Sequence, residues 1–210
     1  MSEPLIKIDL HVHTSKGSPC AESHDPLTIA DTMVRNDIQG LVITEHNTLW
    51  TQQEIDNLNT GLENRKIYRG MEISSGCHHF ILIGIENTDK LFEGIDPDTL
   101  MKIVKDQGAV IILAHPYSGC SKNETISYPK GLMAVEVMST VTRENDFTKA
   151  IDLCSRHHLK PVAGSDAHCD SKVGDFYTVF PSLPANETEL ATMIRKGQGS
   201  PHTGKTGFLI

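Results

Sequence analysis

The chain has 210 residues, a length that suits one globular domain with a sizeable core, and we expect that domain to cover residues 1–210. Hydrophobic residues make up 38% and charged residues 22%, which excludes the disordered, collagen-like and low-complexity classes. The formal net charge of −8 argues against binding through a broad cationic surface, so a nucleic acid is expected only as a substrate.

Short apolar runs alternate with helical patterns along the chain. The runs predict strands at residues 5–10, 41–44, 68–73, 80–84, 109–114, 134–137 and 161–164. Helices are predicted from residue 26 to about 35, from 97 to the glycine at 108, around 147–154 and at about 187–195. Two of them begin at Asp-Pro pairs, Asp25-Pro26 and Asp96-Pro97, which supply an N-cap and a first helical residue. The tail after Gly197 is expected to be loose.

Continuous apolar strands separated by helices are typical of parallel α/β proteins, in which both faces of the sheet are covered. A barrel is favoured over an open sheet, because a polar motif follows each of several separate apolar runs. The carboxyl ends of barrel strands converge on one mouth, whereas those of an open sheet lie along an edge. Convergence is what a metal cluster requires.

Neither a membrane segment nor a secretory signal is expected. The longest apolar runs, such as residues 109–114, fall short of the roughly 20 residues that span a bilayer. The first residues lack a cationic region followed by an apolar core, so a cytoplasmic location is predicted. The five cysteines include no CxxC pair, and their odd number favours reduced thiols.

Two short motifs and one acidic residue suggest a metal site. His11 and His13 stand two apart at the end of a predicted strand, so both imidazoles lie on one side and can reach one cation. Asp166 and His168 repeat this arrangement with a carboxylate and an imidazole. Glu72 lies within an apolar strand, where an uncompensated acid is costly. Each alone has a structural explanation, such as an N-cap or an ion pair; together they indicate metal binding.

Four motifs, taken in order, resemble those of the PHP (polymerase and histidinol phosphatase) superfamily of metal-dependent phosphoesterases. They are Asp-Leu-His-Val-His-Thr at 9–14, Ile-Thr-Glu-His-Asn at 43–47, Ala-His-Pro at 114–116 and Gly-Ser-Asp-Ala-His at 164–168. Glu72 and His79 match the glutamate and histidine that the family carries between the second and third motifs. The resemblance runs from about residue 5 to residue 170.

The resemblance implies a distorted (β/α)7 TIM-like barrel that holds two or three divalent metals at one mouth. The implied ligands are His11, His13, Glu72 and Asp166 for the first metal, Glu72, His79 and His115 for the second, and His46 and His168 for the third. Mixed imidazole and carboxylate ligands suit Mn²⁺, Fe²⁺ or Zn²⁺ better than Ca²⁺ or Mg²⁺.

Two positions depart from the family pattern. The third site usually gains an Asp or His from the loop after the first motif, but this loop offers only the Ser18 hydroxyl and the Cys20 thiol. Cys20 is either a thiolate ligand or, the reading we favour here, a small packed thiol. Glu45 stands where the family has Asp, and it is expected to orient His46 through a hydrogen bond.

The remaining polar residues receive simpler interpretations. His79 is favoured over His78 as the ligand because family members place the ligand directly before the apolar strand. Glu136 is expected to face the site or an arginine without binding metal. His157 and His158 are predicted to end a helix, His24 and His202 to be solvated, and Arg143 and Lys122 to lie on surface loops or to contact a substrate phosphate.

The predicted reaction is hydrolysis of a phosphate ester of a small metabolite or nucleotide by a metal-activated water. His46 and His168 are the candidate catalytic residues, because an imidazole there could protonate the leaving alcohol. The alternatives are a nuclease or oligonucleotide phosphodiesterase and a non-catalytic metal-binding module. Neither the substrate nor the oligomeric state follows from the sequence.

Overall fold

The computed structural model describes residues 5–21, 24–118 and 129–204. Within these ranges the strands are β1 (Ile6–Val12), β2 (Gly40–His46), β3 (Lys66–Ser75), β4 (His78–Ile83), β5 (Val110–Leu113), β6 (Ala134–Met138), β7 (Lys160–Ala163), β8 (Phe176–Phe180) and β9 (Ser200–Thr203). The α-helices are α1 (Ile29–Arg35), α2 (Gln52–Asn59), α3 (Pro97–Asp106), α4 (Glu144–His157) and α5 (Glu187–Arg195). These strands form one sheet in the order β7-β6-β5-β4-β3-β2-β1-β8-β9.

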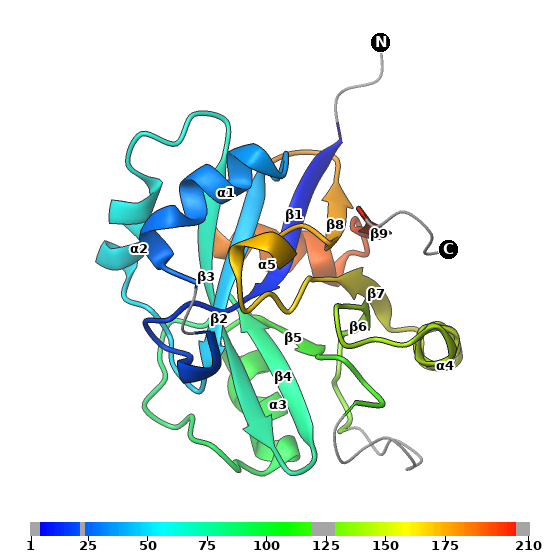
Figure 1. Ribbon diagram of the computed structural model, residues 1–210. Helices are drawn as coiled ribbons and strands as arrows, with labels where there is room; N and C mark the ends of the chain where they lie inside the picture. The colour runs from blue at the N-terminus through cyan, green and yellow to red at the C-terminus, as the bar shows by residue number, and fades with distance from the viewer. Residues whose placement is uncertain (1–4, 22–23, 119–128, 205–210) are drawn as a thin grey trace.

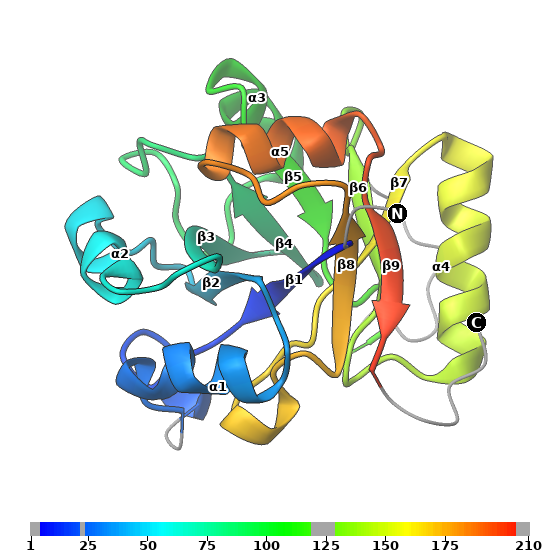
Figure 2. The same cartoon turned by 90° about the horizontal axis from the view of Figure 1, so that it is seen from above.

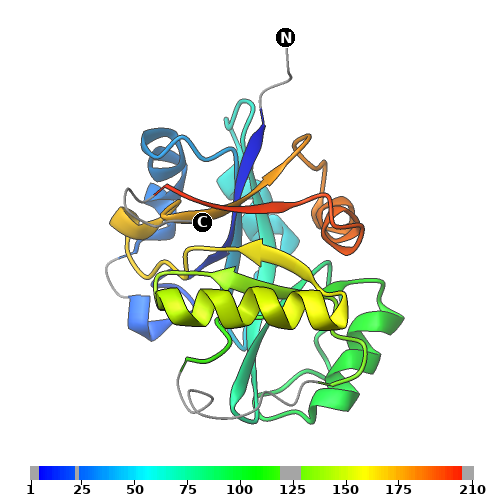
Figure 3. The same cartoon turned by 90° about the vertical axis from the view of Figure 1, so that its right-hand side faces the viewer.

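The sheet curls until its two ends nearly meet, which gives the distorted TIM-like barrel expected from the sequence (Figure 1). Seen from above, α1 and α2 lie on one side of the sheet and α4 on the other (Figure 2). Figure 3 shows α4 lying along β6 and β7, with β8 and β9 beyond them. Helices therefore cover the outside of the barrel while the strand ends remain open at the mouth.

The sheet is mixed, so the expectation of an all-parallel sheet is wrong in part. Strand β4 runs antiparallel to both β3 and β5, β8 runs antiparallel to β1, and β9 runs antiparallel to β8. Only two residues separate β3 from β4, and a connection that short permits only an antiparallel pair. Because β4 runs backwards, its first residues lie at the same mouth as the last residues of the parallel strands.

Three elements were not predicted from the sequence. Strand β9 falls in the tail that was expected to be loose, because its sequence Ser-Pro-His-Thr has no apolar alternation. It is ordered by pairing with β8. The periodicity of the sequence also missed β8. Thr51 is the N-cap of helix α2. Its side chain accepts a hydrogen bond from the Glu54 amide, and the Glu54 carboxylate accepts one from the Thr51 amide. This Thr-x-x-Glu capping box is a signal that could have identified the helix.

The two Asp-Pro helix starts are confirmed. The Asp25 carboxylate accepts a hydrogen bond from the Leu27 amide at 2.9 Å, although the first turn is a 3₁₀ helix before α1. The Asp96 carboxylate accepts one from the Thr99 amide at 2.9 Å and begins α3. Leu100 is fully buried on α3, as the helical spacing predicted.

The barrel closes where the end of β1 meets the segment after β7. The His13 amide donates to the Ala167 carbonyl at 2.9 Å, and the buried Asp9 carboxylate accepts from the Ser165 amide at 2.8 Å. Gly164 lies so close to β1 that a Cβ atom there would stand 2.7 Å from His11 Cβ. Only glycine permits the backbone at residue 164 to lie this close to His11, so the first and last motifs are in direct contact.

The cysteines differ in part from the prediction of reduced thiols. Cys77 is disulfide-bonded, whereas Cys20, Cys154 and Cys169 are free. A count of cysteines does not reveal which thiols pair, because pairing requires a close approach that only the fold provides. No helix in the described ranges has the length and hydropathy needed to cross a membrane.

The closure of the barrel can be tested at Thr178, a buried residue of β8 whose hydroxyl contacts β7. Thr178 Oγ1 accepts from the Ala163 amide at 2.8 Å and donates to the Ala163 carbonyl at 2.9 Å. Thr178→Val keeps the shape but leaves these groups unpaired, so the free energy of unfolding should fall by about 1–3 kcal/mol. Urea denaturation measures this change. The exposed Thr148→Val on α4 is the control, and equal stability of both variants would contradict the prediction.

Candidate metal centre

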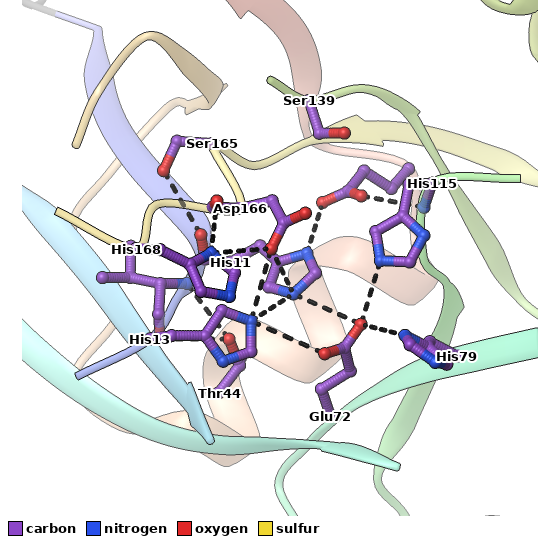
Figure 4. A network of polar contacts seen from close by, with 12 residues as sticks. His11, His13, Thr44, Glu72, His79, His115, Ser139, Ser165, Asp166 and His168 are labelled. Carbon is purple, nitrogen blue, oxygen red and sulfur yellow. Dashed lines mark hydrogen bonds and ion pairs between the residues drawn. The ribbon is translucent and has the colours of Figure 1, made fainter. Parts of the chain in front are cut away.

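The eight predicted site residues meet at the barrel mouth. His11 lies in β1, His46 at the end of β2, Glu72 in β3 and His79 in β4. The others follow strand ends: His13 after β1, His115 after β5, and Asp166 and His168 after β7. Figure 4 labels all of them except His46 and shows those side chains pointing toward one another around the Glu72 carboxylate. His46 Nδ1 approaches the same carboxylate. The structure thus brings together every residue that the motifs singled out.

Glu72 is the centre of this cluster. Its side chain is 1% exposed, and its two carboxylate oxygens lie within 3.5 Å of five imidazoles. The distances are 3.5 Å to His11 Nε2, 3.5 Å to His13 Nε2, 2.9 Å to His46 Nδ1, 3.1 Å to His79 Nδ1 and 3.0 Å to His115 Nε2. The buried Glu72 carboxylate therefore contacts imidazoles from β1, β2 and β4 and from the segments that follow β1 and β5.

Four groups have the spacing expected around one cation. His11 Nε2 and His13 Nε2 are 3.0 Å apart, and Asp166 Oδ1 lies 3.5 Å and 3.4 Å from them. Glu72 completes the group at 3.5 Å from each imidazole. Ligand atoms bound at about 2.1 Å to one ion lie about 3.0–3.5 Å from each other, so these separations fit a shared ion.

Two further groups of ligand atoms adjoin the first. His115 and His79 both approach Glu72 Oε1, at 3.0 Å and 3.1 Å. On the other side, His13, His46 and His168 offer nitrogen atoms that lie within 4.8 Å of one another. The His13 ring lies between the other two, with centroid distances of 4.4 Å to each. His13 therefore belongs to the third group as well as the first, which the sequence did not suggest.

Neighbouring groups orient the innermost imidazoles. Glu136 Oε1 lies 3.0 Å from His11 Nδ1, and its second oxygen accepts from the His115 amide at 2.9 Å. A carboxylate only accepts, so His11 carries its hydrogen on Nδ1 and presents the Nε2 lone pair to the cluster. His168 likewise places Nδ1 3.0 Å from the Asp166 carbonyl. Glu136 thus has the supporting role that was expected of it.

The expectation for Glu45 is wrong: its carboxylate does not contact the His46 side chain. Adjacent residues of a strand point to opposite faces, and Glu45 accepts from the Trp50 indole at 3.2 Å and from the Ser18 hydroxyl at 2.5 Å. Because Ser18 gives its hydrogen to Glu45, its oxygen accepts from His13 Nδ1 at 3.0 Å. Glu45 therefore orients His13 through Ser18.

The backbone at two of the site residues lies in the left-handed region, which is unfavourable for residues with a side chain. The φ angles are 24° at His115 and 55° at Asp166. Each such conformation costs about 1–3 kcal/mol and persists where the surrounding structure requires it. Both side chains face the cluster of site residues (Figure 4).

The charges of the site residues favour the binding of a cation. Burial raises the pKa of Glu72 and Asp166, but the surrounding imidazoles outweigh it and hold both pKa values well below the usual range. Burial lowers the pKa of His13 to about 4, so this imidazole is neutral at pH 7. Burial also lowers the pKa of His11, but the carboxylates of Glu136, Asp166 and Glu72 outweigh it and raise that pKa well above its usual value.

The donor set fits divalent transition metals. It combines imidazole nitrogens with anionic carboxylates, a mixture that suits Mn²⁺, Fe²⁺ or Zn²⁺. In addition, Glu72 Oε2 is buried, and no well-aligned hydrogen bond from a described residue reaches it although His46 Nδ1 is 2.9 Å away. A buried anionic oxygen without an aligned donor is costly unless a cation compensates it.

Several other predicted residues can now be placed. Of the adjacent pair, His79 faces Glu72, whereas the His78 ring stacks edge-on against Phe80. The favoured prediction that Cys20 is a packed thiol is wrong. The residue is exposed because the loop after β1 turns outward there. Its Sγ lies 3.4 Å from His46 Nε2. Arg143 is exposed at the start of α4, while Lys122 falls outside the described residues.

The remaining histidines lie away from the cluster or beside it. His24 is fully buried, with Nε2 3.5 Å from Asp170 Oδ1, so the expectation that it is solvated is wrong; the loop after β1 folds inward at this point. His202 is half-buried against the Tyr177 ring, which also departs from that expectation. His157 and His158 end α4, as predicted.

Comparison with known proteins gives matches in sequence. Residues 144–198, from α4 to just beyond α5, match a family model described as PHP-associated. The uncharacterized protein MJ0417 of Methanocaldococcus jannaschii is 27% identical over 187 residues, which cover 85% of this chain and 72% of that protein.

Solved structures share the fold. A two-domain protein from Bacteroides vulgatus, described as containing a predicted PHP-like metal-dependent phosphoesterase, matches with a TM-score of 0.74 and 16% identity. The chain has the PHP fold. The lesion-specific endonuclease PfuEndoQ from Pyrococcus furiosus matches with a TM-score of 0.66 and 15% identity. The two matches cover 95% and 94% of this chain, which spans only 65% and 58% of those proteins.

The solved structures confirm the distorted TIM-like barrel predicted from the motifs. The family-model match over residues 144–198 agrees with the resemblance to the PHP superfamily. The family-model match contains the last of the four motifs, at residues 164–168, and lies C-terminal to the other three.

Proton release on metal binding should report the charge state of the PHP-type site. The contact with Glu72 raises the pKa of His46, and the same carboxylate outweighs burial to raise that of His115. Together with His11, whose pKa is also raised, these imidazoles keep their protons to higher pH than a free imidazole does, and a bound ion must displace those protons. Zn²⁺ affinity should therefore fall as the pH is lowered from about 8 to about 6. Calorimetry in buffers of different ionisation enthalpy measures the protons released; finding none would contradict this charge assignment.

Proposed function

We propose that the chain is a metal-dependent phosphoesterase that hydrolyses a phosphate ester of a small metabolite or nucleotide. The observation that carries this proposal is the convergence of five imidazoles and the Asp166 carboxylate around Glu72, at a mouth that solvent reaches. The side-chain exposure rises outward, from 0% at His11 to 13% at His115 and 33% at His168. Cations held inside would thus face a ligand arriving from solution.

A cavity beside the cluster supports a small substrate. Its volume is about 300 Å³, and its lining consists of His115, Tyr117, Ser118, Val141, Arg143, Asp146 and Asp166. Two of these residues belong to the metal centre, so the cavity opens directly onto it. Arg143 supplies a cation to the lining, and its planar guanidinium suits a phosphate or carboxylate. The volume is at the lower end of those typical of small-molecule sites.

The proposed ligands are the eight residues of the cluster, for two or three ions of Mn, Fe or Zn. Such ions, when bound, would polarise the phosphoryl oxygens and supply a water of lowered pKa. Glu136 and Ser18 would keep the imidazoles of His11 and His13 in the tautomer that binds a cation. His46 and His168, 31% and 33% exposed, lie at the mouth and could give a proton to the leaving alcohol.

Glu72→Gln should remove metal binding and activity together. The amide keeps the size of the side chain but loses the charge that faces five imidazoles, so hydrolysis of p-nitrophenyl phosphate should fall by at least about 100-fold. Elemental analysis and the aryl phosphate assay measure the two effects on the same preparation. Glu63→Gln, at an exposed turn, is the matched control. Near-normal turnover in Glu72→Gln would make this residue an ordinary ion-pair partner.

Arg143→Ala should weaken binding of the part of the substrate that lies beyond the scissile phosphate. Loss of a charge-assisted contact should raise KM by about 10- to 100-fold for a phosphorylated metabolite with a second anionic group. The KM for p-nitrophenyl phosphate, which has no such group, should change little. A panel of sugar phosphates and nucleoside monophosphates tests this, with Arg156→Ala on α4 as the control. Equal effects of both variants would exclude Arg143 as a substrate contact.

A second function, cleavage of a nucleic acid phosphodiester, is favoured by one observation, the structural likeness to the endonuclease PfuEndoQ. The net charge of −8 weighs against it. Parallel assays with p-nitrophenyl phosphate, bis(p-nitrophenyl) phosphate and an oligonucleotide distinguish the two. Faster turnover of the diesters would favour the nuclease. Absence of all turnover in metal-loaded protein would instead favour a non-catalytic metal-binding module.

A further inference from the structure

The loop after β1 brings a thiol to the outer edge of the metal centre. Cys20 lies in a 3₁₀ turn at Pro19–Ala21 and is exposed, so apolar packing does not explain its position. Its Sγ lies 3.4 Å from His46 Nε2. His46 is also the imidazole whose Nδ1 is 2.9 Å from Glu72 Oε2. The His46 ring therefore stands between a buried carboxylate and an exposed thiol.

The distance between the two atoms fits a shared ion. In a tetrahedral zinc site, Zn–S is about 2.3 Å and Zn–N about 2.0–2.1 Å, which places sulfur and nitrogen about 3.5 Å apart. The observed 3.4 Å agrees with that spacing. It also agrees with a weak hydrogen bond between a thiol and an imidazole, so the distance alone does not decide between the two.

Two observations about the surroundings favour a ligand. His13, His46 and His168 already bring nitrogen atoms within 4.8 Å of one another beside Cys20, but imidazole ligands contribute no negative charge to a divalent ion. In addition, the 1% exposed Glu72 carboxylate, whose Oε2 no aligned donor from the described residues reaches, faces Nδ1 of the His46 ring, so Nε2 is the nitrogen that faces Cys20. A thiolate at Cys20 would supply the missing anionic ligand from the solvent side.

We propose that Cys20 is a thiolate ligand, together with His46, at the outermost metal position, and that this position prefers a thiophilic ion such as Zn²⁺ or Co²⁺ over Mn²⁺. Soft sulfur ligands favour zinc, whereas Mn²⁺ prefers oxygen ligands. The inference rests on the proposed metal-dependent function and specifies the metal class of its outer site. It concerns binding only, so it can be tested without a substrate.

The primary experiment titrates Co²⁺ into the metal-depleted protein and follows near-ultraviolet absorption. Thiolate ligation gives a charge-transfer band, which should be present in the wild type and in Cys169→Ser and absent in Cys20→Ser. Cys169 is the matched control, because it follows His168 directly and is a free cysteine near the same mouth. A band of equal strength in Cys20→Ser, or none in the wild type, would overturn the proposal.

Two further measurements do not depend on a spectroscopic band. In the wild type, Zn²⁺ should protect Cys20 from iodoacetamide at least about tenfold more than Mn²⁺ does, as read by peptide mass spectrometry. Cys20→Asp replaces the thiolate by a carboxylate and should shift the relative affinity of the outer site toward Mn²⁺ by about tenfold or more. Equal protection by both ions, or an unchanged preference in Cys20→Asp, would contradict thiolate ligation.

Failure of this inference differs from failure of the proposed function. If the protein binds metal and hydrolyses p-nitrophenyl phosphate but shows no thiolate band, the phosphoesterase stands and Cys20 is not a ligand. If the band is present without turnover, Cys20 is a ligand in a centre that does not act on aryl phosphates.

Discussion

The whole site depends on keeping one buried carboxylate, that of Glu72, compensated by positive charge. An anion that is 1% exposed is tolerated only when cations or several hydrogen bonds surround it. Five imidazoles from β1, β2, β4 and the ends of β1 and β5 do this in the present structure, and metal ions would do it more completely. The curvature of the barrel is what allows side chains from so many strands to reach one point.

A second layer of polar groups holds that arrangement in place. Glu136 orients His11 and also accepts from the His115 amide, so it connects β1 with the segment after β5. On the opposite side, Glu45 acts through Ser18 on His13. Each inner imidazole is therefore bound at one nitrogen by the protein and presents the other to the centre, which is the condition for a preorganised metal site.

The sequence predicted which side chains would meet, because residues that follow successive barrel strands must converge. It did not predict the direction of Glu45, which depends on the alternation of side chains along β2 and on where Ser18 lies. It also misplaced Cys20 and His24, since both lie in the loop after β1, where no periodicity indicates which residues turn inward. Strand β9 was missed because pairing with β8, rather than local propensity, orders it.

The seam between β1 and the segment after β7 determines when the centre can form. The hydrogen bond from the Ser165 amide to Asp9 joins residues 156 positions apart in the chain. At a ribosomal rate of about 5–20 residues per second, His11 and His13 precede Asp166 by roughly 8–30 s. Until then the nascent chain presents His11, His13 and Glu72 without Asp166, the second acid of their site. Metal loading of the innermost position is therefore a late event of synthesis, and any chain that stops before Asp166 lacks it.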